Sequence, residues 1–380
     1  MVRLHIPYLL TALGAVLVAA KQGNDGARCT TFNIPSVAQN GTSNVQFTSS
    51  APGLDAPKVN PVNGSTYDWW YFDVVDANPA SKASVVAAFF ASSHEAFALL
   101  DDEASLVTVG YVWMNFENGT MVSFHQIANG ATIVLEGDSS NGVWHESGMQ
   151  WTMDPTAKNV VITFDIPGNL AGTVTLQSTA PGHYPCGPVE GGQTMQVMPH
   201  VGWANLIPDG NASVDLLVKK TPLKFRGVGY HDKNWGDKPF TASVSTWYWG
   251  HGRVGPYSIV WFDVFDPTGQ ESVSAYVSKN DAIIVASCKP GSIKVRPMGN
   301  ASFPPFVGAA FPEGYHMVID MADEGTLTVN ATINAPNIGA NPVYFRGTAH
   351  LSAVVTPKKG KATTETGVAL LEQFELAPPA

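Results

Sequence analysis

The sequence contains little charge, and the charge it has is mostly negative. Only 14% of its residues are charged, and 31 acidic residues against 21 Lys and Arg give a formal net charge of −10. Proteins that bind nucleic acid neutralise phosphates with clustered Lys and Arg. The one cationic cluster here, KKGK at residues 358–361, fits a solvated turn. The composition therefore argues against nucleic acid as a partner, whereas 44% hydrophobic residues allow large buried cores.

Cysteine is also scarce. Cys29, Cys186 and Cys288 are too few and too far apart for a zinc ribbon or a redox CxxC pair. In an oxidising compartment we expect one disulfide and one remaining thiol, but the spacing does not say which two residues pair. Three buried free thiols are the alternative.

Long apolar runs are absent after the first residues of the chain. Arg3 precedes an apolar stretch over residues 6–18, and the small residues Ala19 and Ala20 follow it. A membrane-spanning helix needs about 20 apolar residues, so this shorter, interrupted stretch predicts a signal peptide over residues 1–20, cleaved near Ala20. We therefore expect a protein of the secretory pathway, secreted or lumenal, with no membrane span in the mature chain.

Familiar catalytic motifs are missing. The chain has no GxSxG nucleophile elbow, HExxH motif or Walker loop, and no GxGxxG sequence that opens a helix. Its histidines are scattered, and no closely spaced group of them has the pattern of a zinc site. We expect neither a metal nor an organic cofactor.

Short β-type runs separated by Gly, Pro, Asn and Asp dominate the chain after residue 60. Examples are residues 69–75, 84–91, 107–115, 160–166, 258–264 and 327–333. Asn-Gly pairs, which favour hairpin turns, begin at residues 118, 129 and 141. Helical periodicity is almost absent, with residues 95–106 the best candidate for a short helix or loop. The spacing predicts an all-β protein built of sandwiches or barrels.

A weak internal repeat places an aromatic strand before an apolar strand in each half of the chain. The segments are residues 68–73 with 84–90, and residues 246–251 with 257–263. One β-barrel per half gives an N-terminal extension over residues 21–58, a first barrel over 59–222 and a second barrel over 223–380. Chance similarity between two aromatic strands is the alternative.

Six Asn-x-Ser/Thr tripeptides, which are acceptor sites for N-glycosylation, agree with the expected localisation in the secretory pathway. Their asparagines are Asn40, Asn63, Asn118, Asn211, Asn300 and Asn330. We expect several of them to carry sugars on surface turns.

The string GVGYHDKNWGDKP at residues 227–239 is the most specific in the chain. It brings His231, Asp232 and Lys233 together with aromatic and hydrogen-bonding residues between glycines. Polar groups shielded by rings can have shifted pKa values suited to proton transfer. An equally weighted alternative is a structural connector whose side chains cap backbone groups.

Aromatic rings are concentrated in the same regions of the sequence. They are Trp69, Trp70, Tyr71, Phe72, Trp235, Trp247, Tyr248, Trp249, Tyr257, Trp261 and Phe262. Alternate residues of a strand share one face, so Trp247 and Trp249 should point together while Tyr248 points away. Such rings can line a cavity for an apolar, unsaturated ligand. Ordinary core packing is the alternative for each of them.

These residues carry a resemblance to a known superfamily. The string at residues 230–236, the strand at 247–251 with Gly255-Pro256-Tyr257 after it, and WWYFD at 69–73 resemble the double-lipocalin superfamily. That superfamily includes carotenoid 1,2-hydratases and fungal decalin-forming Diels-Alderases. The chain is most similar to secreted fungal hetero-Diels-Alderases of tropolone-sesquiterpene meroterpenoid biosynthesis, over about residues 55–375. The resemblance implies an all-β fold of two lipocalin-like antiparallel β-barrels in tandem.

The resemblance also implies an activity without a cofactor. Such an enzyme assists the loss of water from a hydroxymethyl tropolone to give a quinone-methide-like heterodiene. It then holds that diene against a humulene-type sesquiterpene for a stereoselective [4+2] addition, which forms a dihydropyran. This reaction needs little from the protein beyond placement of the reactants, exclusion of water and a few hydrogen bonds. Orienting two reactants can alone supply effective molarities on the order of 10⁵ M.

The expected site residues form two groups. Proton transfer and polarisation of the tropolone oxygens are assigned to Asp232 with Lys233, or to His251. The walls and hydrogen bonds around the substrates are assigned to Trp70, Tyr71, Trp247, Trp249 and Tyr257. Three other functions stay open: a non-catalytic carrier of an apolar metabolite, an isoprenoid hydratase, and a purely structural secreted glycoprotein with a filled core.

Overall fold

The protein consists almost entirely of antiparallel β-strands, as the sequence predicts. The computed structural model describes residues 21–22, 28–50, 53–100, 106–339 and 341–376, and the predicted signal peptide lies outside these ranges. Its helical segments are α1 (Phe240–Ser243) and the 3₁₀ turn Ala322–Glu324. Residues 95–100 form turns rather than a helix. No helix among the described residues is long and apolar enough to cross a membrane.

The first sheet contains most of the N-terminal half. Its main path runs in the order β1-β2-β9-β10-β11-β12-β13-β17-β18-β5-β6-β7-β8. The strands are β1 (Lys21–Gln22), β2 (Arg28–Ile34), β5 (Tyr67–Asp76), β6 (Ser84–Ser92), β7 (Thr108–Asn115), β8 (Met121–Ile127), β9 (Ala131–Glu136), β10 (Ser139–Trp144), β11 (Met149–Met153), β12 (Asn159–Ile166), β13 (Leu170–Ser178), β17 (Val201–Val218) and β18 (Thr221–Gly236). Short strands β14 (His183–Tyr184) and β16 (Gln196–Met198) pair with β17, and β15 (Gly187–Pro188) pairs with β14. Separately, β3 (Asn44–Val45) pairs with β4 (Val59–Asn60).

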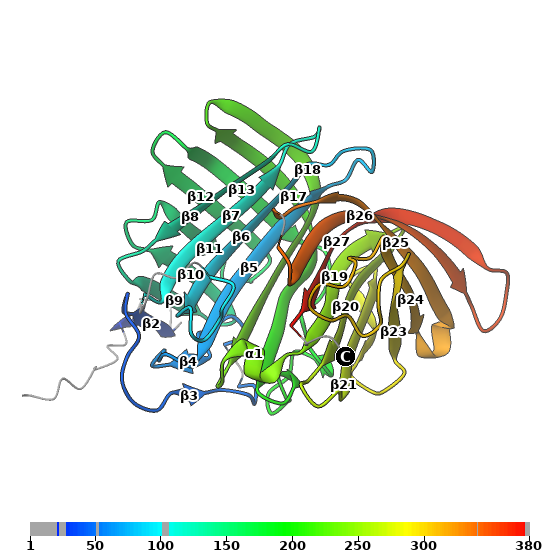
Figure 1. Ribbon diagram of the computed structural model, residues 1–380, viewed down its shortest axis with the longest axis horizontal. Helices are drawn as coiled ribbons and strands as arrows, with labels where there is room; N and C mark the ends of the chain where they lie inside the picture. Colours follow the sequence, from blue (N-terminus) through cyan, green and yellow to red (C-terminus); the bar gives the residue numbers. More distant parts are fainter. Residues whose placement is uncertain (1–20, 23–27, 51–52, 101–105, 340, 377–380) are drawn as a thin grey trace, which may run out of the picture.

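The second sheet contains the C-terminal half and curls beside the first (Figure 1). Its order is β22-β21-β20-β19-β27-β26-β25-β24-β23. The strands are β19 (Thr246–Val254), β20 (Tyr257–Phe265), β21 (Glu271–Lys279), β22 (Ala282–Ser287), β23 (Ile293–Met298), β24 (Gly314–Asp320), β25 (Thr326–Pro336), β26 (Tyr344–Thr356) and β27 (Thr363–Glu375). Two curled antiparallel sheets in tandem agree with the predicted fold class.

The change from one sheet to the other comes later in the chain than the predicted division after residue 222. Lys219 and Lys220 have positive φ and turn the chain back on itself, so that β18 pairs with β17 and then with β5. A division after residue 222 would cut this hairpin, and in the structure β18 belongs to the first sheet. The chain crosses to the second sheet between Gly236 and Thr246, through α1. In the same way, β2 of the predicted extension over residues 21–58 joins the first sheet through β9.

Three hydrophobic cores divide the interior. One lies in the first sheet, one in the second, and the third is a layer between them. On β19, Trp247 and Trp249 belong to the layer between the sheets and Tyr248 to the second core, which confirms the predicted alternation. On β5, Trp70 belongs to the first core and Tyr71 to the layer between the sheets. Strands at the junction are therefore buried on both faces.

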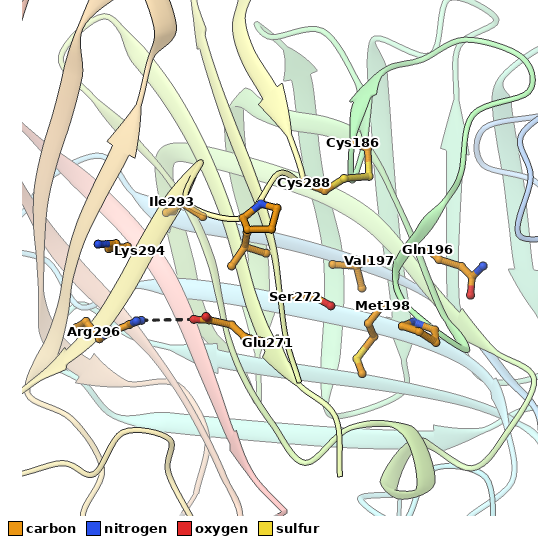
Figure 2. Close-up of a pocket in the computed structure, with 14 residues that line it drawn as sticks. Cys186, Gln196, Val197, Met198, Glu271, Ser272, Cys288, Ile293, Lys294 and Arg296 are labelled. Atoms are coloured by element: carbon orange, nitrogen blue, oxygen red, sulfur yellow. Dashed lines mark ion pairs between the residues drawn. A yellow bond between two sulfur atoms is a disulfide. The ribbon is translucent and has the colours of Figure 1, made fainter. Parts of the chain in front are cut away.

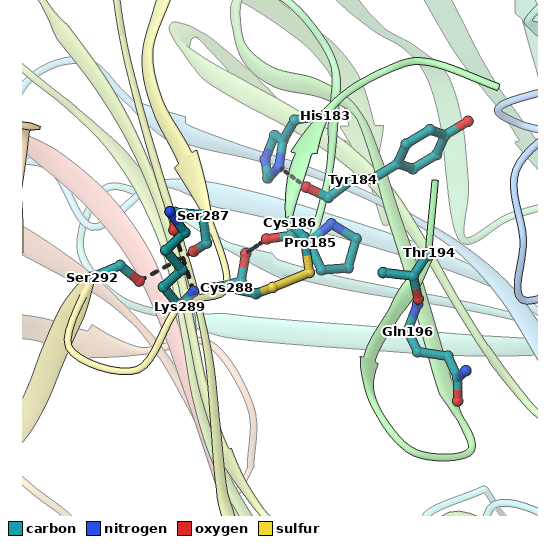
Figure 3. Close-up of a disulfide and its surroundings, with 11 residues drawn as sticks. His183, Tyr184, Pro185, Cys186, Thr194, Gln196, Ser287, Cys288, Lys289 and Ser292 are labelled. Carbon is teal, nitrogen blue, oxygen red and sulfur yellow. Dashed lines mark hydrogen bonds between the residues drawn. A yellow bond between two sulfur atoms is a disulfide. The ribbon is translucent and has the colours of Figure 1, made fainter. Parts of the chain in front are cut away.

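A disulfide and an ion pair fasten the two sheets together. Cys186, beside β15, is bonded to Cys288, which follows β22 (Figure 3). Cys29 is free, so the expected single disulfide with one remaining thiol is confirmed. Arg253 on β19 donates to Asp209 on β17, with Nη2 to Oδ1 at 2.6 Å.

Five of the six sequon asparagines are exposed in the structure. They are Asn40, Asn118, Asn211, Asn300 and Asn330. Asn63 is half-buried, and its Nδ2 donates to the carbonyl oxygen of Gly41 at 3.0 Å. Glycosylation at these positions stays a prediction.

Candidate active site between the two sheets

Two small cavities lie in the layer between the sheets. Their volumes are about 80 Å³ and about 30 Å³. Four residues belong to the walls of both: Trp69, Tyr71, Trp247 and Glu372. Each cavity exceeds the ~10–15 Å³ that one water needs, but organic ligands usually occupy pockets of roughly 300 Å³ or more. Side chains must therefore move when a substrate enters.

Asp232 forms part of the wall of the smaller cavity. Its Oδ2 accepts hydrogen bonds from Trp203 Nε1 and from the Tyr230 hydroxyl, both at 2.7 Å. Asn234 Nδ2 lies 3.4 Å from its Oδ1. Burial raises the pKa of Asp232 from 3.8 to about 6, although the hydrogen bonds from Trp203 and Tyr230 act to lower it. Loss of water is thus the stronger effect at this carboxyl.

Glu372 on β27 lines both cavities. Its Oε1 accepts a hydrogen bond from the Tyr344 hydroxyl at 2.6 Å and lies 3.8 Å from Arg346 Nη1. Burial raises the pKa of Glu372 from 4.5 to about 7. The nearby charge of Arg346 acts to lower this pKa, but the effect of burial is larger. The charge of Asp232 raises the pKa further. Near neutral pH much of this carboxyl is protonated and can donate a proton.

Several buried polar atoms of the cavity walls have no hydrogen-bond partner among the described residues. They are the Tyr71 hydroxyl, Asn234 Oδ1, Trp247 Nε1, Trp249 Nε1 and Arg346 Nη2. Buried polar groups in proteins are nearly always paired, so a group of exceptions around these two adjoining cavities needs an explanation. Four donors and one acceptor in the walls of the two cavities fit a ligand that carries oxygen.

Four of the predicted site residues meet at the smaller cavity. They are Tyr71, Asp232, Trp247 and Trp249. Tyr71 on β5 pairs with Asp232 on β18, and Trp249 on β19 pairs with Glu372 on β27. The rings of Tyr71 and Trp249 meet edge to face, with centroids 5.4 Å apart. The structure therefore contains a small cavity with indole walls and ionisable side chains.

Lys233 and Trp70 lie on the other face of the same two strands, inside the first sheet. Lys233 Nζ donates to Asp68 Oδ1 at 2.5 Å and lies 3.5 Å from the centroid of the Trp70 ring. Consecutive residues of a strand point to opposite sides, so Asp232 and Lys233 cannot act on one substrate. The structure therefore does not support the expectation that Asp232 and Lys233 act together on one substrate. Trp70 belongs to the first core and lies outside the walls of both cavities.

His251 and Tyr257 also lie outside both cavities. His251 Nε2 contacts both carboxylate oxygens of Asp73 at 2.9 Å, and its ring stacks on Tyr230 with centroids 4.2 Å apart. His251 thus supports the wall that holds Asp232 rather than reaching a substrate in the cavity. Tyr257 lies at the start of β20 in the second core, where Lys279 Nζ is 3.4 Å from its hydroxyl.

Sequence reasoning did not identify Glu372, Tyr344 or Arg346. A signal for Glu372 was present, because it is a lone carboxyl in the otherwise apolar run VALLEQF at residues 368–374. A charge in such a run is expected to be buried and paired. Arg346 follows two aromatic residues, Tyr344 and Phe345, at the start of a strand. Nothing in the sequence connects Arg346 with Glu372.

A wider cleft of about 420 Å³ lies elsewhere between the halves, beside the disulfide (Figure 2). Two of its charged groups pair with each other, since Arg296 Nη1 lies 3.6 Å from Glu271 Oε1. No residue of its wall has an unpartnered buried polar atom in the part of the chain that the structure describes. The unpartnered polar atoms therefore favour the two smaller cavities, despite their size. Within the described residues, no group of three or more His, Cys, Asp or Glu is placed to hold a metal ion.

Comparison with known sequences places the chain among fungal proteins. The quinolone epoxide rearrangement protein asqO of Emericella nidulans is 34% identical over 87% of this chain and 88% of its own length. The protein penF of Penicillium thymicola, which has the same description, is 35% identical over 80% of this chain and 84% of its own. The Diels-Alderase poxQ of Penicillium oxalicum is 28% identical over 66% of this chain and 56% of its own.

The fold and the family agree with these similarities. The crystal structure of CghA with Sch210972 matches with a TM-score of 0.72 over 93% of this chain and 100% of that chain, at 16% identity, which supports the predicted tandem lipocalin-like fold. A family model described as Diels-Alderase-like matches residues 29–295. The prediction of a Diels-Alderase-type enzyme is thus confirmed at the level of the family. This chain belongs to the Diels-Alderase-like family.

Proposed function

We propose that the protein catalyses the acid-assisted opening of a C–O bond in a small unsaturated molecule, followed by ring formation or rearrangement. The observation that carries this proposal is the position of Asp232 and Glu372, two buried carboxyls with raised pKa values in the wall of one cavity. A protonated carboxyl in a water-poor space is a suitable general acid. The surrounding rings of Trp247 and Trp249 stabilise positive charge that develops on carbon.

The chemistry requires only proton transfer and placement. Glu372 or Asp232 gives its proton to the substrate oxygen, the C–O bond breaks, and its electron pair goes to that oxygen. The carbon becomes electron-poor and is attacked by a double bond or a neighbouring group of the substrate, which forms the new bond. Any proton lost in that step returns to the carboxylate. Exclusion of water keeps the electron-poor carbon from being hydrated.

An epoxide is the first candidate substrate. It opens when its oxygen is protonated, and both relatives at 34–35% identity are described as quinolone epoxide rearrangement proteins. The aromatic walls of the larger cavity, which include Tyr111 and Trp113, suit the flat ring of a quinolone. We therefore infer an aromatic or otherwise conjugated epoxide as substrate.

The second candidate is the hetero-Diels-Alder reaction predicted from the sequence. Protonation of the hydroxymethyl oxygen of a hydroxymethyl tropolone releases water, and the ring hydroxyl returns a proton to the carboxylate to give the neutral heterodiene, which adds to a humulene-type sesquiterpene. The description of relatives such as poxQ as Diels-Alderases favours a cycloaddition of this kind. Two adjoining cavities with shared walls would hold the two partners side by side once they widen. The same carboxyls serve both reactions, because each begins with the loss of a C–O bond.

The experiment offers both substrates to the purified protein. A quinolone epoxide is incubated alone, and a hydroxymethyl tropolone is incubated with humulenol, each against a reaction without protein. We expect faster and stereoselective product formation with one of them, and loss of the acceleration in the Asp232→Asn/Glu372→Gln double variant. Glu365→Gln on the same strand is the matched control. Binding without any product would instead favour the carrier function, and full activity of a folded double variant would show that other groups catalyse the reaction.

We also propose that the chain enters the secretory pathway and carries sugars. Three features support this localisation: the N-terminal apolar stretch, five exposed sequons and a disulfide between the halves. The disulfide is relevant because disulfides persist in oxidising compartments. Protein expressed in a fungal host should lose mass on treatment with an N-glycosidase. An unchanged mass in a correctly secreted protein would contradict the glycosylation.

A further inference from the structure

Arg346 is a buried cation in the wall of the cavity of about 80 Å³, and one of its donor nitrogens has no partner among the described residues. Only 2% of the residue is exposed, and it is part of the cavity wall. Its Nε donates to Asn337 Oδ1 at 3.0 Å and its Nη1 donates to the Tyr344 hydroxyl at 3.2 Å. Nη2 has no partner within the described structure. The hydrogen bonds of Nε and Nη1 therefore hold the guanidinium in place, and Nη2 remains able to donate to a ligand in the cavity.

Glu372 and Asp73 are the carboxyl groups whose charge attracts Arg346. A guanidinium stays protonated at all ordinary pH values. The carboxyl that pairs with it, Glu372, is 3.8 Å away, and its Oε1 already accepts the Tyr344 hydroxyl. When Glu372 carries the proton that it needs as a general acid, the guanidinium has no counter-charge there. A buried charge without a partner is costly, so the site favours a ligand that brings a negative charge.

The surroundings of Arg346 add a preference for a flat ring. The guanidinium lies 4.3 Å from the centroid of the Trp113 ring. Trp113 in turn stacks on Tyr111, with centroids 5.2 Å apart and planes 10° apart, and both rings line the cavity. A planar ligand can therefore lie along these rings while an oxygen at its edge meets Nη2.

We propose that Arg346 is the specificity-determining residue for an oxyanion on a planar substrate ring, such as an ionised enol. The inference rests on the proposed function, because it uses the same cavity. It also names the substrate oxygen that the protein binds. The oxyanion binds at Arg346, while the oxygen that is lost lies toward Glu372. The substrate is thus anchored at one end and activated at the other.

The test compares tropolone with its methyl ether as probes, by isothermal titration calorimetry at a pH at which tropolone is ionised. The two molecules have similar rings, but only tropolone offers an anionic oxygen. We expect the wild-type protein to bind tropolone at least about tenfold more tightly, which corresponds to the ~1.4 kcal/mol of one modest charge-assisted hydrogen bond. Arg346→Met should bind both probes equally. Arg346→Lys, which keeps the charge without the planar fork, should retain part of the preference.

Arg296→Met is the matched control. Arg296 also stacks on a ring, 3.8 Å from the centroid of Phe303, but lies outside both cavities. Equal affinity of the wild type for both probes, no binding of either, or an unchanged preference in folded Arg346→Met would overturn the inference. The wild-type comparison remains decisive if the variants do not fold. A tropolone preference without turnover would contradict only the proposed reaction, and turnover that is insensitive to Arg346→Met would contradict only this inference.

Discussion

Burial sets the acidity of the two cavity carboxyls. Asp232 accepts hydrogen bonds from an indole and a phenol, and such bonds favour the ionised form, yet its pKa is raised to about 6. Glu372 has a guanidinium 3.8 Å away and still has its pKa raised to about 7. At both residues the loss of water outweighs the favourable partners. The charge of Asp232 also contributes to the raised pKa of Glu372.

The first prediction concerns the pH dependence of catalysis. If a protonated carboxyl starts the reaction, kcat/KM should fall as the pH rises past about 7, where Glu372 loses its proton. Glu372→Gln should lower kcat/KM by about 10²–10⁴-fold and remove this descending limb, because Gln cannot donate an acidic proton. The measurement is the pH profile of kcat/KM for both proteins. Glu365→Gln should keep the wild-type profile, and a descending limb that survives in Glu372→Gln would assign the acid to another group.

At the scale of elements, strands buried on both faces explain how neighbours in the sequence acquire different roles. β5, β18 and β19 are almost fully buried along the junction. A compact polar string such as residues 230–235 is therefore divided between the first core and the layer between the sheets. A shift of the register by one residue would exchange the two sets, so the register at these strands must be fixed closely.

Gly250 helps to fix that register, because it sits between Trp249 and His251 where the backbone has no room for a side chain. A Cβ there would lie 2.2 Å from the Trp261 ring and 2.6 Å from the carbonyl oxygen of Leu370. We predict that Gly250→Ala lowers the free energy of unfolding by about 1–3 kcal/mol, as overpacking of a core does. Urea denaturation measures the change. Gly339→Ala, where a Cβ meets nothing within 4 Å, is the control, and equal stability of both variants would contradict this explanation.

At the scale of the whole molecule, the site depends on how the two sheets are held against each other. The Cys186–Cys288 disulfide closes a loop with a sequence separation of 102. Replacing both cysteines with Ser should lower the free energy of unfolding by about 2–5 kcal/mol, because the unfolded chain gains conformational freedom. Denaturation curves of the Cys186→Ser/Cys288→Ser variant provide the test. Cys29→Ser should leave the curve unchanged, and an equally stable double variant would show that packing alone joins the halves.

The raised pKa of Glu372 also affects the stability of the molecule. A carboxyl whose pKa is higher in the folded state contributes stability below its unfolded value of 4.5, and this contribution is lost as the pH rises through about 7. The full change is about 3 kcal/mol for a shift of this size. Relative to the wild type, Glu372→Gln should therefore gain about that much stability between these pH values. Unfolding free energies of both proteins at several pH values measure it, and a constant difference would mean that Glu372 has no raised pKa.

The sequence by itself determined the local features of this protein. Period-two runs and Asn-Gly turns specified antiparallel strands, the repeated aromatic strands specified two halves, and alternation placed Trp247 and Trp249 on one face. Each of these depends on residues close together in the chain. The motif at residues 230–236 also led to the family and to Asp232.

Only the tertiary structure decided which groups share a cavity. Asp232 and Lys233 are neighbours in sequence but lie in different cores, whereas Asp232 and Glu372 are 140 positions apart and line the same cavity. The raised pKa values arise only when packing of the second sheet against the first removes water from both carboxyls. Burial of that kind depends on contacts between distant strands, and no local pattern in the chain encodes it.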